Sequence, residues 1–216
     1  MNKKIIKGIV LKSETRGEYN KLITIYSYEF GKMQTFVSSA KKIVAKLSYA
    51  TEPLTESEFF ICINNAYIKS KIIGANIINN NTKLKINFIR NLYALYVVQL
   101  IDNFLFFNYA NAKKYILISR IFEILCICKY PKRVLVAFIL RFLKLSGYNF
   151  LEYLKNNKNN DILNIEHIIK TLSNCSANEA DMFKEAEDIK VWDCVENYLK
   201  KYTRCSSLNK FLKKFI

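Results

Sequence analysis

The stretch GEYNKLITIYSYEFGKMQTFV, residues Gly17–Val37, decides the fold of the first part of this chain. It holds two apolar runs, Leu22–Tyr26 and Met33–Val37, and a polar segment between them that ends at Gly31-Lys32. Short runs rich in β-branched and aromatic residues, separated by a glycine, are typical of two strands joined by a turn. The stretch therefore predicts a β-hairpin, and the turns around it are the first places to look for a functional surface.

Three further apolar runs lie within the first 80 residues. They are Ile5–Leu11, Phe59–Ile63 and Tyr67–Ile73. Five short strands in so few residues predict a small antiparallel barrel or sandwich. Because successive side chains of a strand point to opposite faces, we expect Tyr26 and Phe36 to fill its interior.

The rest of the chain has apolar residues at helical spacing. The expected helices are Leu84–Phe107, Tyr115–Cys128, Pro131–Leu145, a short one after the possible capping box Ser176-x-x-Glu179, and Val191–Tyr202. Gly147 suits the position just after the third of them. The pattern changes near Asn79–Asn81. We therefore predict an α+β protein with an N-terminal β domain, residues 1–80, followed by an all-α helical domain, residues 81–216.

The charge of the chain is strongly positive. Lys and Arg number 34 against 18 Asp and Glu, which gives a formal net charge of +16. Such an excess favours polyanionic partners, either nucleic acid or an anionic membrane surface. The many Lys, Asn and Ile residues also fit a coding sequence rich in A and T, which would raise the Lys content without a functional reason. Both explanations stay open on composition alone.

The longest apolar stretch, Phe88–Phe107, contains charged and amide side chains such as Arg90 and Asp102, which a membrane span tolerates poorly. The first residues lack the features of a secretory signal. We therefore expect a cytoplasmic protein, and in that compartment its six cysteines are expected to be reduced.

No arrangement of residues typical of an enzyme stands out. His167 is the single histidine, and Cys126 and Cys128 are two apart in a helical pattern, so their side chains diverge. The acidic groups at 52–58 and 181–188 fit solvated faces. Neither the G-x-x-x-x-G-K-[ST] nor the G-x-G-x-x-G phosphate-binding motif occurs. We predict no catalytic residue, no metal site and no cofactor.

Basic residues near the turns of the β domain alternate with aromatic ones. The candidates for contacts to phosphate are Arg16, Lys21, Lys32, Lys41, Lys42 and Lys46. Small barrels bind single strands with such a set, because cations follow the phosphates while aromatic rings stack on bases. Lys41 and Lys42 lie between strand runs, where burying an unpaired charge is costly, so we expect them to be solvated.

The order of motifs in the β domain matches a known pattern. GIVLKS (Gly8–Ser13) is an apolar strand, Gly17-Glu18 is a turn, Gly31-Lys32 ends the next turn, and Ala40–Lys42 closes a basic loop. This series resembles the opening of the RecO recombination-mediator family. The resemblance implies an oligonucleotide-binding (OB) barrel followed by a helical domain.

Two positions depart from the family pattern of the basic loop, A-[KR]-G-A-[RK]-[RK]. Ser38 and Ser39 stand where the family has a basic residue and a glycine, and Tyr28 replaces the threonine of its T-x-x-x-G-[KR] segment. Ser38 in place of the basic residue implies a weaker grip on phosphate, and Ser39 in place of the glycine implies a less pliant loop.

The rest of the chain also resembles the family, from the end of the β domain into the helical part. Leu54–Phe60, Tyr93–Leu100, Phe138–Tyr148 and Arg204–Leu208 match successive family segments in the correct order. Many members carry four zinc-binding cysteines just after the G-Y pair. Here the segment NFLEYLKNNKNND (Asn149–Asp161) contains no cysteine, so we expect the zinc module to be absent and residues 151–161 to form a loop.

The resemblance implies partners as well as a fold. Family members bind single- and double-stranded DNA, anneal complementary strands and, with RecR, help to load the recombinase RecA onto strands coated by the single-strand-binding protein SSB. They dock the acidic, Phe-ended SSB tail in a basic-edged apolar groove of the helical domain. By resemblance, the candidates for that groove are Arg133, Phe138, Leu140, Arg141 and Lys144. A core helix with solvated cations is an equally open interpretation of this segment.

The leading hypothesis from the sequence is a non-enzymatic DNA repair adaptor of the RecO type, associated with the bacterial nucleoid. The main alternative is an RNA-binding barrel protein linked to translation. An enzyme whose site has no recognisable motif is the third possibility.

Overall fold

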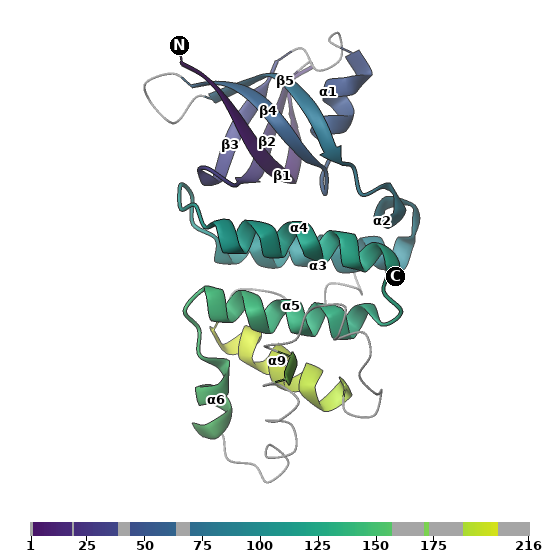
Figure 1. Ribbon diagram of the computed structural model, residues 1–216, viewed down its shortest axis with the longest axis vertical. Coiled ribbons are helices and arrows are strands. Elements are labelled where there is room, and N and C mark those ends of the chain that lie inside the picture. Colours follow the sequence, from purple (N-terminus) through teal and green to yellow (C-terminus); the bar gives the residue numbers. More distant parts are fainter. Residues whose placement is uncertain are drawn as a thin grey trace. The chain divides into compact units, whose positions relative to one another are not determined.

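A computed structural model describes residues 2–18, 20–38, 44–63, 70–156, 171–172 and 188–202. The chain forms two compact units. The first contains residues 1–82 and 105–119, and the second contains residues 83–104 and 120–216. Residues 105–119 therefore pack with the strands, although they lie beyond the predicted domain boundary near residue 80. Figure 1 labels the helices and strands of both units.

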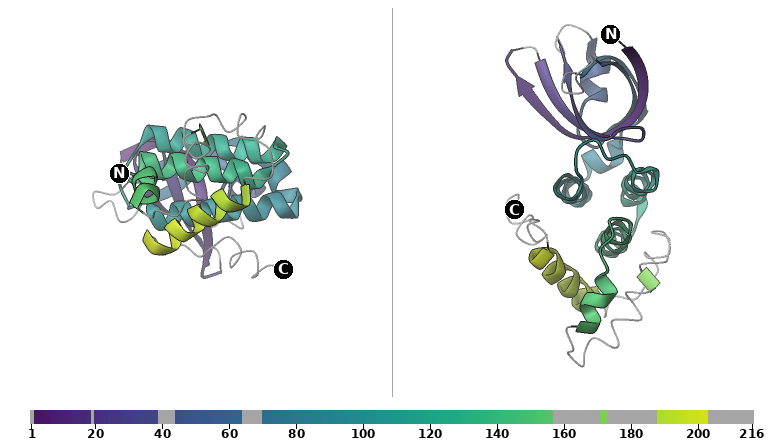
Figure 2. Two further views of the ribbon diagram at one scale, coloured as in Figure 1. Left: turned by 90° about the horizontal axis from the view of Figure 1, so that it is seen from below. Right: turned by 90° about the vertical axis from the view of Figure 1, so that its left-hand side faces the viewer.

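The first unit is a closed five-stranded barrel. Its strands are β1 (Asn2–Arg16), β2 (Asn20–Ser27), β3 (Gly31–Val37), β4 (Glu56–Ile63) and β5 (Ser70–Asn79). They pair in the order β1-β2-β3-β5-β4, and β4 returns to β1. The right-hand view of Figure 2 shows the strands curving round into a ring. An N-terminal OB-type barrel followed by helices confirms the predicted fold class.

The barrel is not wholly antiparallel. Four of the five pairings are antiparallel, but β3 and β5 run parallel, with Thr35 opposite Ser70 and Val37 opposite Ile72. The Oγ of Thr35 donates to the Ser70 carbonyl at 3.0 Å, and the Oγ of Ser70 donates to the Gln34 carbonyl at 3.1 Å. These two bonds supplement a short parallel ladder where the barrel closes.

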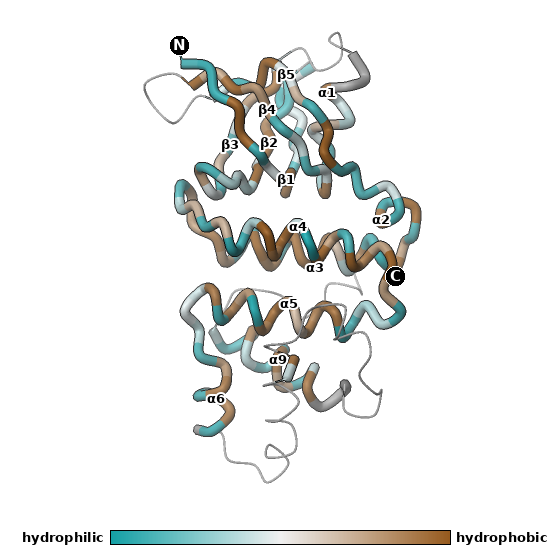
Figure 3. The backbone as a smooth tube through the Cα atoms, viewed as in Figure 1, coloured by the Kyte–Doolittle hydropathy of each residue, from teal (hydrophilic) through white to brown (hydrophobic). Residues whose placement is uncertain are grey.

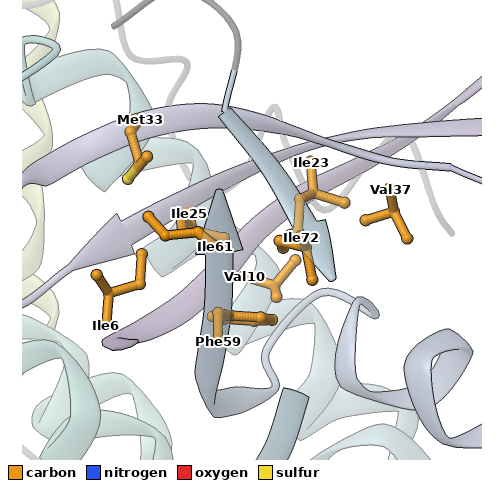
Figure 4. Close-up of a cluster of buried hydrophobic side chains, with 9 residues drawn as sticks. All are labelled: Ile6, Val10, Ile23, Ile25, Met33, Val37, Phe59, Ile61 and Ile72. Atoms are coloured by element: carbon orange, nitrogen blue, oxygen red, sulfur yellow. The ribbon is translucent and has the colours of Figure 1, made fainter. Parts of the chain in front are cut away.

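Alternate residues of each strand make the barrel core. The buried cluster is Ile6, Val10, Ile23, Ile25, Met33, Val37, Phe59, Ile61 and Ile72. Figure 4 shows these side chains converging from all five strands. Since Ile23 and Ile25 point inward, Tyr26 points outward, and Phe36 does so beside Val37. The prediction that Tyr26 and Phe36 fill the interior is therefore wrong for both.

The turn between β2 and β3 is held by a serine and a carboxylate. The Oγ of Ser27 accepts hydrogen bonds from the backbone N–H groups of Glu29 and Phe30, at 3.1 and 3.2 Å. The Glu29 carboxylate in turn accepts from the Ser27 hydroxyl and from the backbone N–H of Lys7. Gly31 then starts β3 with a φ of 73°, which glycine adopts without strain. The predicted hairpin is confirmed.

A short helix, α1 (Val44–Ala50), lies between β3 and β4 and was not predicted. It packs beside β5. At the far end of β5, the buried side chain of Asn81 donates from Nδ2 to the Leu54 carbonyl at 2.7 Å. This bond fixes the end of the last strand, where the sequence changes from strand to helix pattern.

The helices are α2 (Thr82–Ile86), α3 (Phe88–Phe104), α4 (Ala112–Ile127), α5 (Pro131–Leu145), α6 (Phe150–Asn156) and α9 (Asp188–Tyr202). The expected helix over 84–107 is thus two helices, and it ends at residue 104. The other long helices lie close to where the sequence predicted them. Figure 3 shows hydrophobic residues recurring along α3, α4 and α5.

Helix α5 begins and ends as predicted. Pro131 occupies its first turn. After its end, Gly147 has a φ of 83°, the Gly147 N–H donates to Lys144, and the Tyr148 N–H donates to Leu143. This pair of bonds is the Schellman motif, which satisfies carbonyls that the helix leaves free.

Several sequence predictions fall outside the described residues. They concern residues 67–69 of the fifth strand, residues 157–161 of the expected loop, His167, and the capping box at Ser176 and Glu179. For the described part of that loop, residues 151–156, the prediction is wrong, because these residues lie in helix α6. Among the described helices, none has both the length and the apolar character that a membrane crossing requires.

Candidate nucleic-acid interface

The outward face of β2 and β3 carries an exposed aromatic ring. Phe36 is 41% exposed, and its neighbours across the ladders are Leu22 on β2 and Lys71 on β5. The next outward residue of β3 is Gln34, which lies opposite Thr24 on β2. An apolar ring next to a cation and an amide is the combination that stacks a base and contacts its phosphate.

Two cations on this face were not among the sequence candidates. Lys71 is exposed beside Phe36, and Lys12 is exposed on β1 opposite Thr24. The alternation of side chains along the strands could have predicted both lysines. Once Ile23 and Ile25 are assigned to the interior, the cross-strand neighbours of Leu22 and Thr24 must lie on the outer face.

Arg16 and Lys21 lie together at the turn end of the β1–β2 hairpin. Arg16 pairs with Asn20, and Lys21 pairs with Thr15. The Arg16 guanidinium donates to the Glu14 carboxylate at 2.9 Å, and both side chains are largely exposed. Such a pair contributes little to stability, so the arginine is easily diverted to a phosphate.

Lys32 has a different environment from the one that its sequence position suggested. Its side chain is only 7% exposed. The Nζ donates to the Leu105 carbonyl at 3.4 Å and lies 4.6 Å from the centroid of the Phe107 ring. The lysine therefore joins the barrel to residues 105–107 and has little surface left for phosphate.

Three of the basic candidates cannot be located. Lys41 and Lys42 lie outside the described residues, and Lys46 belongs to α1 without a described side chain. Their contact with nucleic acid stays a prediction. The described residues of the candidate interface are therefore Lys12, Arg16, Lys21, Gln34, Phe36 and Lys71.

The helical candidates do not lie on one open surface. Phe138 and Leu140 are 1% and 3% exposed, and the Phe138 ring stacks on Phe142 with centroids 5.6 Å apart. These two residues are part of the core of the helical unit. Their burial favours the core-helix interpretation over an apolar slot at this position.

The three cations of the same helix have different environments. Arg133 is 3% exposed, and its guanidinium carbon lies 4.2 Å from the centroid of the Tyr130 ring. Arg141 is partly buried, and Lys144 is exposed near the end of α5. The structure therefore does not bring the five helical candidates into one groove, and a site for an acidic tail on α5 stays a prediction.

One partly buried carboxylate ties α4 to the barrel within the first unit. Glu56 of β4 accepts hydrogen bonds from the Tyr115 hydroxyl at 2.8 Å and from the Ser119 hydroxyl at 2.7 Å. Burial raises the pKa of Tyr115 far above its usual value, and the charge and hydrogen bond of Glu56 add to the rise. Burial also raises the pKa of Tyr26 to about 12. Both phenols are structural groups that stay protonated at neutral pH.

Within the described residues, no three His, Cys, Asp or Glu side chains come together as a group that would hold a metal ion. Cys126 and Cys128, in α4 and just after its end, do not form disulfides. Burial raises the pKa of the Cys126 thiol, which lowers its reactivity.

Comparison with known proteins identifies the barrel. Residues 1–80 match the family model described as the N-terminal domain of recombination protein O. The chain is 29% identical over 147 residues to the DNA repair protein RecO of Caldicellulosiruptor bescii, a match that covers 68% of this chain and 59% of the relative. The barrel of this chain is similar to the N-terminal domain of RecO. Because 147 residues exceed the length of the barrel, the similarity to RecO continues into the helical part.

Two further RecO proteins match shorter segments. The one from Bacillus mycoides is 29% identical over 97 residues, which is 45% of this chain and 38% of the relative. The one from Caldicellulosiruptor saccharolyticus is 30% identical over 103 residues, which is 46% of this chain and 40% of the relative. The matches thus span from 38% to 59% of the length of these RecO proteins.

Proposed function

We propose that this chain acts in DNA repair as a RecO-type recombination mediator that binds DNA and anneals complementary strands without covalent chemistry. The names of its relatives support the repair role. The exposed Phe36 ring beside Lys71, on the outer face of the family's barrel, is the observation that carries the binding step.

Annealing requires two properties, and these residues provide both. Two single strands repel each other through their phosphates, and cations that neutralise both strands remove that barrier and raise the local strand concentration. An aromatic platform holds bases by stacking without regard to their identity. A chain with a net charge of +16 and such a platform has both properties.

The partners follow from the family alone. We propose that the chain acts together with RecR and binds the acidic tail of SSB. RecA, which is then loaded onto the strand, is an indirect partner. We propose that the basic residues of both units contribute to contacts with the strands, including Lys41, Lys42 and Lys46. The proposed site of action is the bacterial nucleoid, and no cofactor is required.

An RNA-binding role is the alternative that the same surface permits. Stacking and phosphate contacts do not distinguish DNA from RNA, since that distinction depends on contacts to the 2′-hydroxyl. Tight RNA binding without acceleration of DNA annealing would favour this alternative.

The test of the binding step compares Phe36→Ala with Ile5→Ala, a substitution of an exposed apolar residue that pairs with β4 on another part of the barrel. Phe36→Ala should weaken binding of single-stranded DNA by about tenfold, the loss of one stacked base. Ile5→Ala should leave the affinity unchanged. Equal effects of the two substitutions would remove Phe36 from the interface.

A second test concerns the loop that the structure does not describe. Reversing the charge of Lys41 and Lys42 to Glu should weaken DNA binding and make its dependence on salt shallower, because fewer counterions are released. An unchanged salt slope would place the phosphate contacts on other residues.

A further inference from the structure

The connection between α3 and α4 carries the two most exposed aromatic side chains in the described part of the barrel unit, Phe106 and Tyr109, and a third exposed ring, Phe107. Phe106 is 78% exposed, Tyr109 is 74% exposed and Phe107 is 46% exposed. These residues lie in the segment Leu105–Asn111, which belongs to the barrel unit. We call this segment the aromatic loop. Rings that stay in water without covering a core are typical of a surface that binds something.

Main-chain and side-chain bonds fix the aromatic loop to the start of β3. The Lys32 Nζ donates to the Leu105 carbonyl at 3.4 Å, and the Asn108 N–H donates to the Lys32 carbonyl at 2.9 Å. Lys32 and Phe107 form a parallel β-bridge. Further along, the Tyr26 hydroxyl donates to the Asn111 carbonyl at 3.4 Å. The loop is therefore held from both ends, and its exposed rings are pre-positioned.

The close approach of the loop depends on a residue without a side chain. A Cβ atom at Gly31 would lie 2.2 Å from the Tyr109 carbonyl oxygen. Asn108 adopts a φ of 64°, a conformation that asparagine tolerates better than most residues. The sequence at both sides of the contact is thus suited to hold two outward rings on a rigid backbone.

The surroundings of the rings favour nucleic acid over a protein. Asn108 and Asn111 offer amide groups, and exposed Lys113 and partly buried Lys114 follow directly in α4. Flat rings, amides and cations suit stacked bases, base edges and phosphates. The two lysines decide between the partners, because lysine is depleted in protein–protein interfaces but contacts phosphates in nucleic-acid complexes.

The loop also lies on the same face as Phe36. Lys32, which carries the loop, and Phe36 are both outward residues of β3, with Gln34 between them. At a rise of about 3.3 Å per residue, they lie about 13 Å apart along the strand. A strand of nucleic acid that follows β3 from Phe36 therefore reaches the loop.

We propose that the aromatic loop stacks unpaired bases of single-stranded nucleic acid through Phe106 and Tyr109, as an extension of the Phe36 face. This inference rests on the proposed function and adds a second binding element to it. Paired bases hide their faces inside a duplex, so the loop favours single strands over double strands.

The test uses the whole chain with a fluorescently labelled oligo(dT) strand and a duplex of the same length. The double variant Phe106→Ala/Tyr109→Ala should bind oligo(dT) at least about tenfold more weakly and bind the duplex as the original chain does. Its salt slope should stay unchanged, because no cation is lost. Tyr49→Ala removes another exposed ring of the same unit, on α1, and should change neither affinity.

The outcomes separate this inference from the proposed function. If the original chain binds oligo(dT) and the double variant binds it equally well, the loop does not stack bases and the proposed function stands. If the double variant keeps oligo(dT) affinity but loses binding to purified RecR, the loop is a protein-docking surface and the inference is wrong. If the original chain binds neither probe, the proposed function fails together with the inference.

A second measurement guards against an effect on folding. Phe106→Trp places an indole in the loop, and oligo(dT) should quench its fluorescence by stacking. The same measurement on the unchanged chain reports only buried Trp192 and should show little quenching. Equal quenching of both proteins would contradict the inference.

Discussion

Gly31 and Tyr109 approach so closely that a Cβ atom at position 31 would lie 2.2 Å from the Tyr109 carbonyl oxygen. The two residues are far apart in the sequence, and both belong to the barrel unit. Gly31 therefore has two reasons to be glycine, its φ of 73° and the backbone that lies against it. The contact places the aromatic loop on the barrel and leads to the first prediction.

Gly31→Ala should destabilise the chain by more than about 3 kcal/mol, since it adds a backbone clash to the strain of a positive φ. Gly17→Ala is the matched control, because Gly17 has a φ of 70° but no atom within 4 Å of the added Cβ. It should cost only about 1 to 2 kcal/mol. Urea unfolding measures both, and equal losses would mean that the loop does not lie against Gly31.

Lys32 and Lys71 should respond to substitution in opposite ways. Lys32→Met keeps the buried stem but removes the contact to the Phe107 ring and the Leu105 carbonyl, so it should cost about 1 to 2 kcal/mol of stability. It should leave the salt slope of DNA binding unchanged. Lys71→Glu should leave stability within about 0.5 kcal/mol and reduce the salt slope by about 1. A reduced salt slope for Lys32→Met would show that Lys32 contacts phosphate after all.

Glu56→Gln tests the bond between β4 and α4. An amide accepts less strongly than a carboxylate from the Tyr115 and Ser119 hydroxyls, so a loss of about 1 to 3 kcal/mol is expected. The pKa of Tyr115 should also fall toward its usual value, because the charge of Glu56 contributes to its rise. Absorbance titration of the tyrosines measures the second effect. The control is Glu58→Gln on the same strand. A similar loss of stability in that variant would show that the hydrogen bonds of Glu56 to Tyr115 and Ser119 do not cause the effect.

Alkaline pH should destabilise the barrel unit. The pKa of Tyr26 is about 12 in the folded chain against 10 for a free phenol, so the unfolded state loses its proton first. Stability is therefore fully present below pH 10 and falls between about pH 10 and 12, by an amount on the order of 2 kcal/mol. Tyr26→Phe should make the loss in this range smaller. An identical pH profile for the variant, measured by urea unfolding at several pH values, would contradict this assignment.

The sequence was informative where a local pattern determines the outcome. The hairpin at Gly17–Val37, the change near Asn79–Asn81 and the end of α5 at Gly147 all follow from residues that are close in the chain. Their structures depend on turn chemistry and helix caps, which involve neighbours within a few positions.

Features that depend on distant residues were not predictable in the same way. The contact of Lys32 with Phe107 and the burial of Tyr26 under α4 both require knowledge of how residues 105–119 pack. The outward position of Phe36 is an intermediate case. Strand alternation was the correct principle, but a single aromatic residue does not reveal which face is interior until a neighbour such as Val37 is assigned.

The same limit applies to the helical candidates. The segment with Phe138 and Leu140 has apolar residues all round, which is consistent with both a groove wall and a core helix. Only their burial distinguishes the two, and burial depends on the helices that surround α5.

The most direct test of the central claim measures annealing of two complementary DNA oligonucleotides, with and without bound SSB, in the presence of the whole chain. The account predicts faster annealing than in buffer, and a smaller acceleration when Phe36 is replaced by Ala. Failure to accelerate annealing, together with tight binding of RNA, would contradict the account.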